Sequence, residues 1–188
     1  MKSLRLARPH AIMMVGIPGS GKSFFASKFA ETFNAPYIDS LAIEALAKDD
    51  ESAGAMIAML VTEIAKTNQT FLFEGNSDSR VRRTEFTRWA RAHGYVPLLV
   101  WVQTDQSTSK ARTLKAGSLA EDAFIDIVKD FSPPHPDEKP VVISGKHTFA
   151  TQVKVILAHL GRYNRPDQSV VAGVNPGTAR PTQPITVR

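Results

Sequence analysis

The chain has 188 residues, enough for one globular domain with a full core and too few for two domains of ordinary size. Apolar residues make up 43% of it and charged residues 22%, proportions close to the soluble average that argue against wholesale disorder. Because there is no cysteine, disulfide scaffolds, thiolate metal sites and cysteine nucleophiles are excluded.

The formal net charge of +5 is concentrated at the two ends of the chain. Lys2, Arg5 and Arg8 precede residue 11, and four arginines with a single aspartate follow Gly161. The segment between them carries 16 basic and 17 acidic residues. The overall charge therefore gives no independent sign of nucleic-acid binding, and any anion site in the body of the chain must be local.

No apolar run approaches the about 18 residues that a membrane-spanning helix needs. The short apolar run at 11–17 is not followed by the small-residue cleavage site of a secretory signal. We therefore predict a cytoplasmic protein with no membrane partner.

Apolar runs alternate with longer amphipathic segments throughout the chain. In chain order the pattern predicts a strand at 11–15, a helix at 22–33, an extended segment at 36–39, helices at 40–47 and 52–66, a strand at 70–73, a helix at 79–93, a strand at 96–102, helices at 105–115 and 119–131, a Pro-rich loop at 132–139, a strand at 141–144 and a helix at 148–160. This alternation predicts an α/β protein with three layers, α/β/α, around a five-stranded parallel sheet. Residues 1–160 form the predicted domain, and residues 161–188, with four prolines and few large apolar side chains, are predicted to be a disordered basic tail.

Residues 16–23, Gly-Ile-Pro-Gly-Ser-Gly-Lys-Ser, match the pattern G-x-x-x-x-G-K-[ST] in full. An apolar strand precedes the motif and an amphipathic helix follows it, which is the context of a phosphate-binding loop, or P-loop. The glycines permit positive φ and close approach, so that loop amides and the helix N-terminus surround the phosphates. We expect the lysine to reach the β- and γ-phosphates and the serine hydroxyl to ligate Mg²⁺. The motif therefore predicts binding of ATP and Mg²⁺ by Gly16, Pro18, Gly19, Ser20, Gly21, Lys22, Ser23 and Phe24.

A P-loop occurs in several classes of nucleotide-binding protein. The chain has no Asn-Lys-x-Asp guanine signature, and it has little length left to encode the second helical domain of ring-forming ATPases. A small five-stranded P-loop domain with a mobile segment after its fourth strand resembles the P-loop kinases.

Within that class, the sequence resembles the polynucleotide 5′-hydroxyl kinase group, an AAA-domain ATP-binding group. Its near relatives include the zeta-toxin-like sugar kinases and chloramphenicol phosphotransferase. The resemblance is carried by the Gly-x-Pro-Gly-Ser-Gly-Lys-Ser form of the P-loop and by the strand end Phe73-Glu74-Gly75-Asn76, with Arg82 and Arg83 beyond it. The helix 83–93, which leads through Gly94-Tyr95 into the strand 96–102, also matches. The P-loop alone is individually specific.

Asp39 ends the second predicted strand, at the sheet edge where ligands of open α/β folds bind. The resemblance implies that it accepts or orients the acceptor hydroxyl proton, although the group's arginine three residues later is Ala42 here. The alternative is that Asp39 simply caps the following helix. Glu74, at the next strand end, can hold the Mg²⁺ shell through water, or it is simply a solvated strand end. Asn76 is a candidate acceptor ligand or an ordinary turn residue.

Arg82 and Arg83 lie near the predicted acceptor site, where they are candidates for binding a phosphate, although a solvated helix face is the ordinary reading. The segment after the fourth strand corresponds to the lid of P-loop kinases. Arg112 matches the first lid arginine of the resembled group, and Lys115 is the nearest candidate for the second. Both are predicted to neutralise charge on the transferring phosphoryl group. Gly145, Lys146 and Thr148 follow the last strand, where adenine rests in such folds.

Together these features predict an ATP-dependent phosphotransferase that moves the γ-phosphate to a polynucleotide or nucleoside 5′-hydroxyl. Two alternatives remain open. One is a zeta-toxin-like kinase of a small molecule such as a sugar or nucleotide-sugar, and the other is an ATP-binding regulatory protein without phosphotransfer.

Overall fold

A computed structural model describes residues 6–162 of the chain. In chain order, its elements are β1 (His10–Val15), α1 (Lys22–Phe33), β2 (Tyr37–Asp39), α2 (Ser40–Glu44), α3 (Asp50–Lys66), β3 (Phe71–Glu74), α4 (Arg80–Ala92), β4 (Val96–Gln103), α5 (Gln106–Lys115), α6 (Glu121–Asp130), a 3₁₀ turn (Pro136–Glu138), β5 (Val141–Ser144) and α7 (Phe149–Arg162).

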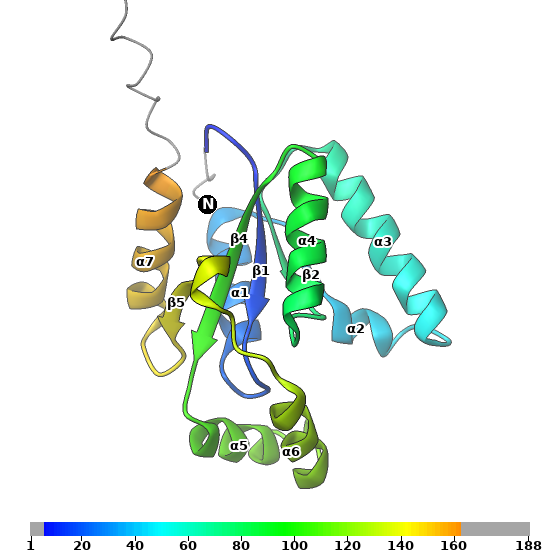
Figure 1. Ribbon diagram of the computed structural model, residues 1–188, viewed down its shortest axis with the longest axis vertical. Helices are drawn as coiled ribbons and strands as arrows, with labels where there is room; N and C mark the ends of the chain where they lie inside the picture. The colour runs from blue at the N-terminus through cyan, green and yellow to red at the C-terminus, as the bar shows by residue number, and fades with distance from the viewer. Residues whose placement is uncertain (1–5, 163–188) are drawn as a thin grey trace, which may run out of the picture.

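The five strands are all parallel and stand in the order β2-β3-β1-β4-β5 (Figure 1). Strand β1 lies in the middle of the sheet and is buried along its whole length, as a strand covered on both faces requires. The register places Met14 of β1 and Asp39 of β2 directly beside Glu74 of β3. The carboxyl ends of these three strands therefore meet at one edge of the sheet, where ligands of open α/β folds bind.

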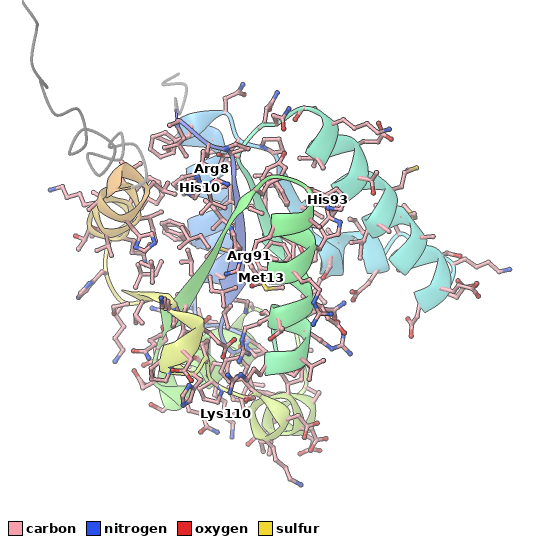
Figure 2. All side chains as sticks on the ribbon, turned by 45° about the horizontal axis from the view of Figure 1, so that its top comes forward. Arg8, His10, Met13, Arg91, His93 and Lys110 are labelled. Carbon is pink, nitrogen blue, oxygen red and sulfur yellow. The ribbon has the colours of Figure 1, made fainter. Side chains whose placement is uncertain are left out.

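Helices cover both faces of the sheet and form two separate cores. On one face α1 and α7 pack against β1 and β4, with Phe25, Phe29 and Ile156 fully buried. On the other face Met13 of β1 lies beneath α4 (Figure 2) and packs with Phe73 and with residues of α3 and α4. The predicted three-layer architecture with a five-stranded parallel sheet is thereby confirmed.

The helices α5 and α6 lie beyond the carboxyl end of the sheet (Figure 1). Figure 2 shows Lys110 of α5 at this end, with Arg8 and His10 toward the opposite end of β1. No helix within residues 6–162 combines the length and the apolar character needed to cross a bilayer.

Three element boundaries differ from the sequence prediction, and capping explains the first of them. The predicted helix 52–66 begins two residues earlier, at Asp50, since Asp49 adopts an extended conformation and its Oδ1 accepts a hydrogen bond from the Ser52 amide at 2.8 Å. The predicted helix 40–47 ends at Glu44. Helix α7 continues to Arg162, so the first two residues of the predicted tail, 161–188, are helical, and the rest of that tail lies outside the described residues.

Candidate active site

The P-loop, residues 16–23, leads from the end of β1 into the first turn of α1. Gly16 and Gly21 have φ values of 146° and 106°, in the region that the sequence analysis expected these two glycines to occupy. Gly21 is the N-cap of α1, and no side chain of the described residues caps that end of the helix. The amides of the first turn are thus free to bind an anion at the positive end of the helix dipole.

Three neighbouring segments hold the P-loop in place. The Oγ1 of Thr104, just after β4, donates a hydrogen bond to the carbonyl oxygen of Ser20 at 2.9 Å. Gly145, just after β5, lies so close that a Cβ there would overlap the same carbonyl oxygen. A Cβ at Gly19, whose φ is 73°, would overlap the Ser109 carbonyl oxygen of α5. These contacts fix the position of the loop that is to bind the phosphates.

Two side chains of the P-loop, Lys22 and Ser23, meet two polar side chains of the neighbouring strands, Tyr37 and Glu74. Glu74 is only 5% exposed, and its two carboxylate oxygens accept hydrogen bonds from Ser23 Oγ at 2.9 Å and from the Tyr37 hydroxyl at 2.8 Å. The Nζ of Lys22 lies 3.9 Å from Glu74 Oε1 and donates to the Ile17 carbonyl oxygen at 3.2 Å. Sequence reasoning found three of these residues and missed Tyr37, although Tyr37 is two residues before Asp39 and so lies on the same face of β2.

Burial shapes the protonation of this cluster. It lowers the pKa of Lys22, while the charges of Glu74 and Asp39 act in the opposite direction. It raises the pKa of Tyr37, and the neighbouring Glu74 carboxylate raises it further, so Tyr37 remains a hydrogen-bond donor. The nearby carboxylates offset only part of the cost of burying the Lys22 ammonium, so an incoming phosphate would stabilise this charge strongly.

The Ser23 hydroxyl and the Glu74 carboxylate are hard oxygen ligands of the kind that Mg²⁺ prefers. Within residues 6–162 there is no cluster of three or more histidine and acidic side chains that could hold a metal ion without help. The donor set therefore fits a Mg²⁺ ion bound together with nucleotide phosphates and water, as is usual for this ion.

Asp39 lies at the carboxyl edge of the sheet, beside Glu74 in the register. Its Oδ1 caps α2 by accepting hydrogen bonds from the amides of Leu41 at 3.1 Å and Ala42 at 3.4 Å. Neither of these bonds uses Oδ2. The structure thus shows the capping role, and the position of Asp39 is also compatible with the catalytic one.

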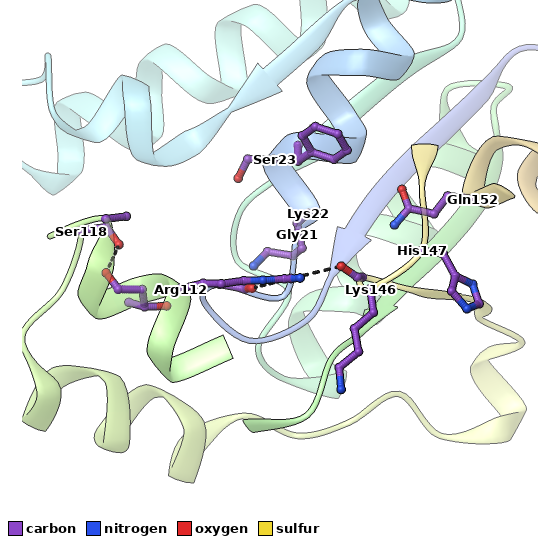
Figure 3. Close-up of a pocket in the computed structure, with 13 residues that line it drawn as sticks. Gly21, Lys22, Ser23, Arg112, Ser118, Lys146, His147 and Gln152 are labelled. Atoms are coloured by element: carbon purple, nitrogen blue, oxygen red, sulfur yellow. Dashed lines mark hydrogen bonds between the residues drawn. The ribbon is translucent and has the colours of Figure 1, made fainter. Parts of the chain in front are cut away.

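A cavity of about 510 Å³ runs from the P-loop to the loop between β5 and α7 (Figure 3). It is lined by Gly19, Gly21, Lys22, Ser23, Phe24, Arg112, Thr113, Ala116, Ser118, Gly145, Lys146, His147 and Gln152. We call it the P-loop cavity. Its volume is within the usual range for small-molecule sites, which is about 300–1,000 Å³.

The two candidate lid residues differ in position. Arg112 lines the P-loop cavity, and its Nη1 donates to the carbonyl oxygens of Gly145 at 3.1 Å and Gly19 at 3.5 Å. Lys115 is exposed and is not among the residues that line the cavity. Arg112 is therefore the candidate that is in place to contact a bound nucleotide.

A second cavity, of about 410 Å³, lies between α3 and α4, and we call it the α3–α4 groove. Two residues predicted to bind the acceptor, Asn76 and Arg82, line it. Arg82 faces Asp78, with Nε and Oδ1 3.5 Å apart. Most other lining residues are apolar or aromatic, namely Met13, Ile57, Ala58, Val61, Phe73, Phe86 and Trp89.

The position of Arg83 differs from the sequence prediction, which made this residue a candidate for binding an acceptor phosphate. Its side chain is fully buried, and its Nε and Nη2 donate to Glu138 at 2.8 and 3.0 Å. Its Nη1 donates to the carbonyl oxygens of Ser77 at 2.9 Å and Ser132 at 2.8 Å. Because the guanidinium is buried and already bonded on all three nitrogens, Arg83 joins α4 to the loop before β5 and is not available to a ligand.

We expect Gly145→Ala to weaken binding of MgATP at least about tenfold, because the added methyl group overlaps Ser20 and must displace the P-loop. Calorimetric titration with MgATP measures the effect. Gly161→Ala is the matched control, since a Cβ there meets no atom within 4 Å. Wild-type affinity in Gly145→Ala would show that the close approach of Gly145 does not position the loop.

The five-stranded parallel sheet, with a P-loop at the carboxyl end of its central strand, defines a P-loop NTPase fold. Residues 12–118 match the family described as AAA domain, and the chain belongs to this family. Among curated protein sequences, none is significantly similar to the chain.

Several solved structures share the fold, and they include P-loop kinases. An APS kinase from Mycobacterium tuberculosis, solved with AMPPNP and APS, has a TM-score of 0.65 at 17% identity over 82% of this chain and 98% of that one. A gluconokinase from Sinorhizobium meliloti 1021 has a TM-score of 0.63 at 18% identity, covering 83% of this chain and 94% of its own. For a sugar kinase from Janibacter sp. HTCC2649 the TM-score is 0.63 at 16% identity, over 82% and 95% of the two chains. At these identities the likeness establishes the fold.

Proposed function

We propose that this protein is an ATP-dependent phosphotransferase that moves the γ-phosphate of ATP to a hydroxyl group of a small molecule. The observation that carries the proposal is the placement of Lys22, Ser23, Glu74 and Asp39 at one edge of the sheet. The P-loop cavity lies on the β5 side of this cluster, and the α3–α4 groove contains Asn76, two residues after Glu74. A nucleotide and an acceptor can therefore approach the same point from different sides.

We expect the phosphates of the nucleotide to bind to the amides of residues 21–23, at the start of α1, and to the Lys22 ammonium. Ser23 and Glu74 would hold Mg²⁺ together with the nucleotide, and the ion would supply positive charge to neutralise the charge that develops during transfer. When the nucleotide binds, we expect Arg112 to exchange its hydrogen bonds to the carbonyl oxygens of Gly19 and Gly145 for a contact with the transferring phosphoryl group.

In the proposed reaction the acceptor oxygen bonds to the γ-phosphorus as the bond from that phosphorus to the bridging oxygen breaks, and ADP leaves. Asp39 takes the hydroxyl proton on Oδ2, because only its Oδ1 is used in capping α2. Lys22 stabilises the charge on the departing and transferred groups.

The acceptor side favours a small molecule over a polynucleotide. Of the two arginines expected to grip a phosphate, Arg83 is buried against Glu138 and Arg82 faces Asp78. The α3–α4 groove has apolar walls, whereas a nucleic-acid groove is lined by cations that follow the backbone. The kinship in fold with a gluconokinase and a sugar kinase supports the same choice.

An acceptor screen tests the proposal. Purified protein with Mg²⁺ and γ-labelled ATP is to be incubated with alcohols, sugars, nucleosides and 5′-hydroxyl oligonucleotides, and label transfer is measured. We expect transfer to a small alcohol or sugar. Transfer to the oligonucleotide alone would restore the polynucleotide prediction, and firm ATP binding without transfer to any acceptor would favour a regulatory nucleotide-binding protein.

Asp39→Asn separates the two roles of this residue. Asparagine caps helices about as well as aspartate, so a residue that only caps α2 tolerates the change. A proton acceptor does not, and we expect the rate of transfer to fall by about 10²–10⁴-fold with ATP affinity retained. Steady-state rates and calorimetric ATP binding, measured on the same preparation, distinguish these outcomes. An unchanged rate would remove Asp39 from the proposed mechanism.

A further inference from the structure

Gln152, in the first turn of α7, lines the P-loop cavity on the side formed by the segment after β5. Gln152 is only 2% exposed, and its side chain lines the P-loop cavity. Figure 3 shows its amide end directed toward the side of the cavity where Lys22 and Ser23 lie. Gln152 is thus a buried polar side chain in the wall that α7 contributes to the cavity.

The orientation of the Gln152 amide is fixed by its neighbour. Its Nε2 donates a hydrogen bond to the carbonyl oxygen of Ser144 at 2.8 Å. In the reversed orientation the amide oxygen would face this carbonyl oxygen, and two acceptors would be in contact. The other end of the amide is therefore the oxygen, Oε1.

That oxygen has no hydrogen-bond partner among residues 6–162. A buried acceptor without a donor is costly, and such groups in folded proteins usually have a partner outside the chain, a water molecule or a ligand. The cavity that Gln152 lines is the side from which a donor can arrive. Because Gln152 is so little exposed, a donor that reaches it must lie deep in the cavity, against α7, and not at the opening of the cavity.

The chemistry of the nucleotide bases decides which one suits this oxygen. Adenine carries an amino group at C6, which is a donor, whereas guanine and hypoxanthine carry a carbonyl oxygen there. A 6-oxo purine in the same place would bring an acceptor against Oε1 and leave both unpaired. We propose that Gln152 Oε1 accepts a hydrogen bond from the 6-amino group and makes this protein selective for adenine nucleotides.

This inference rests on the proposed function, since it assigns the base-binding end of the same nucleotide site. It goes beyond that function because it names one atom as the determinant of base choice. A site with a buried acceptor discriminates against ligands that lack the donor, since the acceptor is then left unpaired.

Calorimetric titration without acceptor tests it, with the Mg²⁺ complexes of ATP, ITP and purine riboside triphosphate as ligands. These three share the ribose and phosphates, and they differ at C6 by an amino group, an oxygen and a hydrogen. We expect wild-type protein to bind MgATP about 10–100-fold more tightly than either of the others. In Gln152→Met, which keeps the length of the side chain without its polar atoms, we expect this ratio to fall below about threefold.

The control is Gln69→Met, an exposed glutamine before β3 that does not line the P-loop cavity, and its ratio should equal that of wild type. Binding of MgITP serves as an internal control, because damage to the loop after β5 would weaken the binding of ITP as much as that of ATP. If Gln152→Met loses affinity for ATP and ITP equally, Gln152 only supports Ser144, and the proposal is overturned. It is also overturned if Gln152→Met keeps the wild-type ratio.

The test separates this proposal from the proposed function. Tight binding of all three nucleotides by the wild-type protein contradicts the role of Gln152 and leaves the phosphotransferase proposal standing. Failure of the wild-type protein to bind any of them contradicts both.

Discussion

Replacement of Lys22 by methionine is expected to lower the rate of phosphotransfer by about 10³-fold. Lys22 is the cation of the P-loop, and it is held at the cavity wall by the Ile17 carbonyl oxygen, 3.2 Å from Nζ. Methionine keeps most of the length and apolar contact of the side chain and removes the charge. Charge stabilisation at a desolvated phosphoryl group contributes on this scale in enzymes of this kind.

The same substitution should leave the protein folded. Burial lowers the pKa of Lys22, so an ammonium at this place is costly, and Glu74 keeps its donors Ser23 and Tyr37 when the lysine is removed. We therefore expect a thermal unfolding temperature no lower than that of wild type. Lys28→Met is the matched control, because Lys28 is an exposed lysine of α1 that pairs with Glu31. A Lys22→Met protein that keeps a tenth or more of wild-type activity would contradict the assigned role.

The second large effect concerns stability. Arg83→Met is expected to lower the free energy of unfolding by about 3–5 kcal/mol, the usual cost of removing one partner from a buried ion pair. It leaves Glu138, with a side chain only 9% exposed, beside two carbonyl oxygens that have lost their shared donor. Urea unfolding at neutral pH measures the change. Arg88→Met on the exposed side of α4 is the control and should alter stability by less than about 0.5 kcal/mol.

The pH dependence of this loss identifies its cause. Burial acts to raise the pKa of Glu138, but hydrogen bonds from Arg83 and from the His135 amide outweigh it, so the pKa lies below its ordinary value. A depressed carboxyl pKa contributes stability that is complete above the unfolded value of about 4.3. That contribution is lost as the pH falls through the lower, folded-state pKa. The difference between wild type and Arg83→Met should accordingly shrink below about pH 4. A difference independent of pH would mean that packing, rather than the ion pair, stabilises this contact.

Those parts of the fold that depend on local pattern were predictable from the sequence. The strand at 141–144 and the helix at 22–33 were placed correctly, because each is a continuous apolar or amphipathic run between strong turn signals. The P-loop was found because its residues are contiguous. The parallel sheet followed from the alternation of strands and helices.

What could not be predicted depends on pairs of residues that are distant in the chain. Arg83 and Glu138 are 55 positions apart, and nothing in the local charge pattern of α4 distinguishes a buried arginine from an exposed one. The contacts of Tyr37 with Glu74 and of Thr104 with Ser20 are similarly remote. Asp39 illustrates a different difficulty, since the same carboxylate suits a helix cap and a proton acceptor, and the sequence is compatible with both uses.

Two anchors determine how the segment that contains α5 and α6 can move. At its start, Thr104 is tied to the Ser20 carbonyl oxygen. At its end, the amide of Ser132 donates to the Asp78 carbonyl oxygen at 2.8 Å, and its own carbonyl oxygen accepts from Arg83. The first attachment point of this segment is thus bonded to the P-loop, and the second to the loop after β3 and to helix α4. Under the proposed function, a movement of residues 105–131 is therefore confined between these two points, and it requires Arg112 to leave the carbonyl oxygens of Gly19 and Gly145.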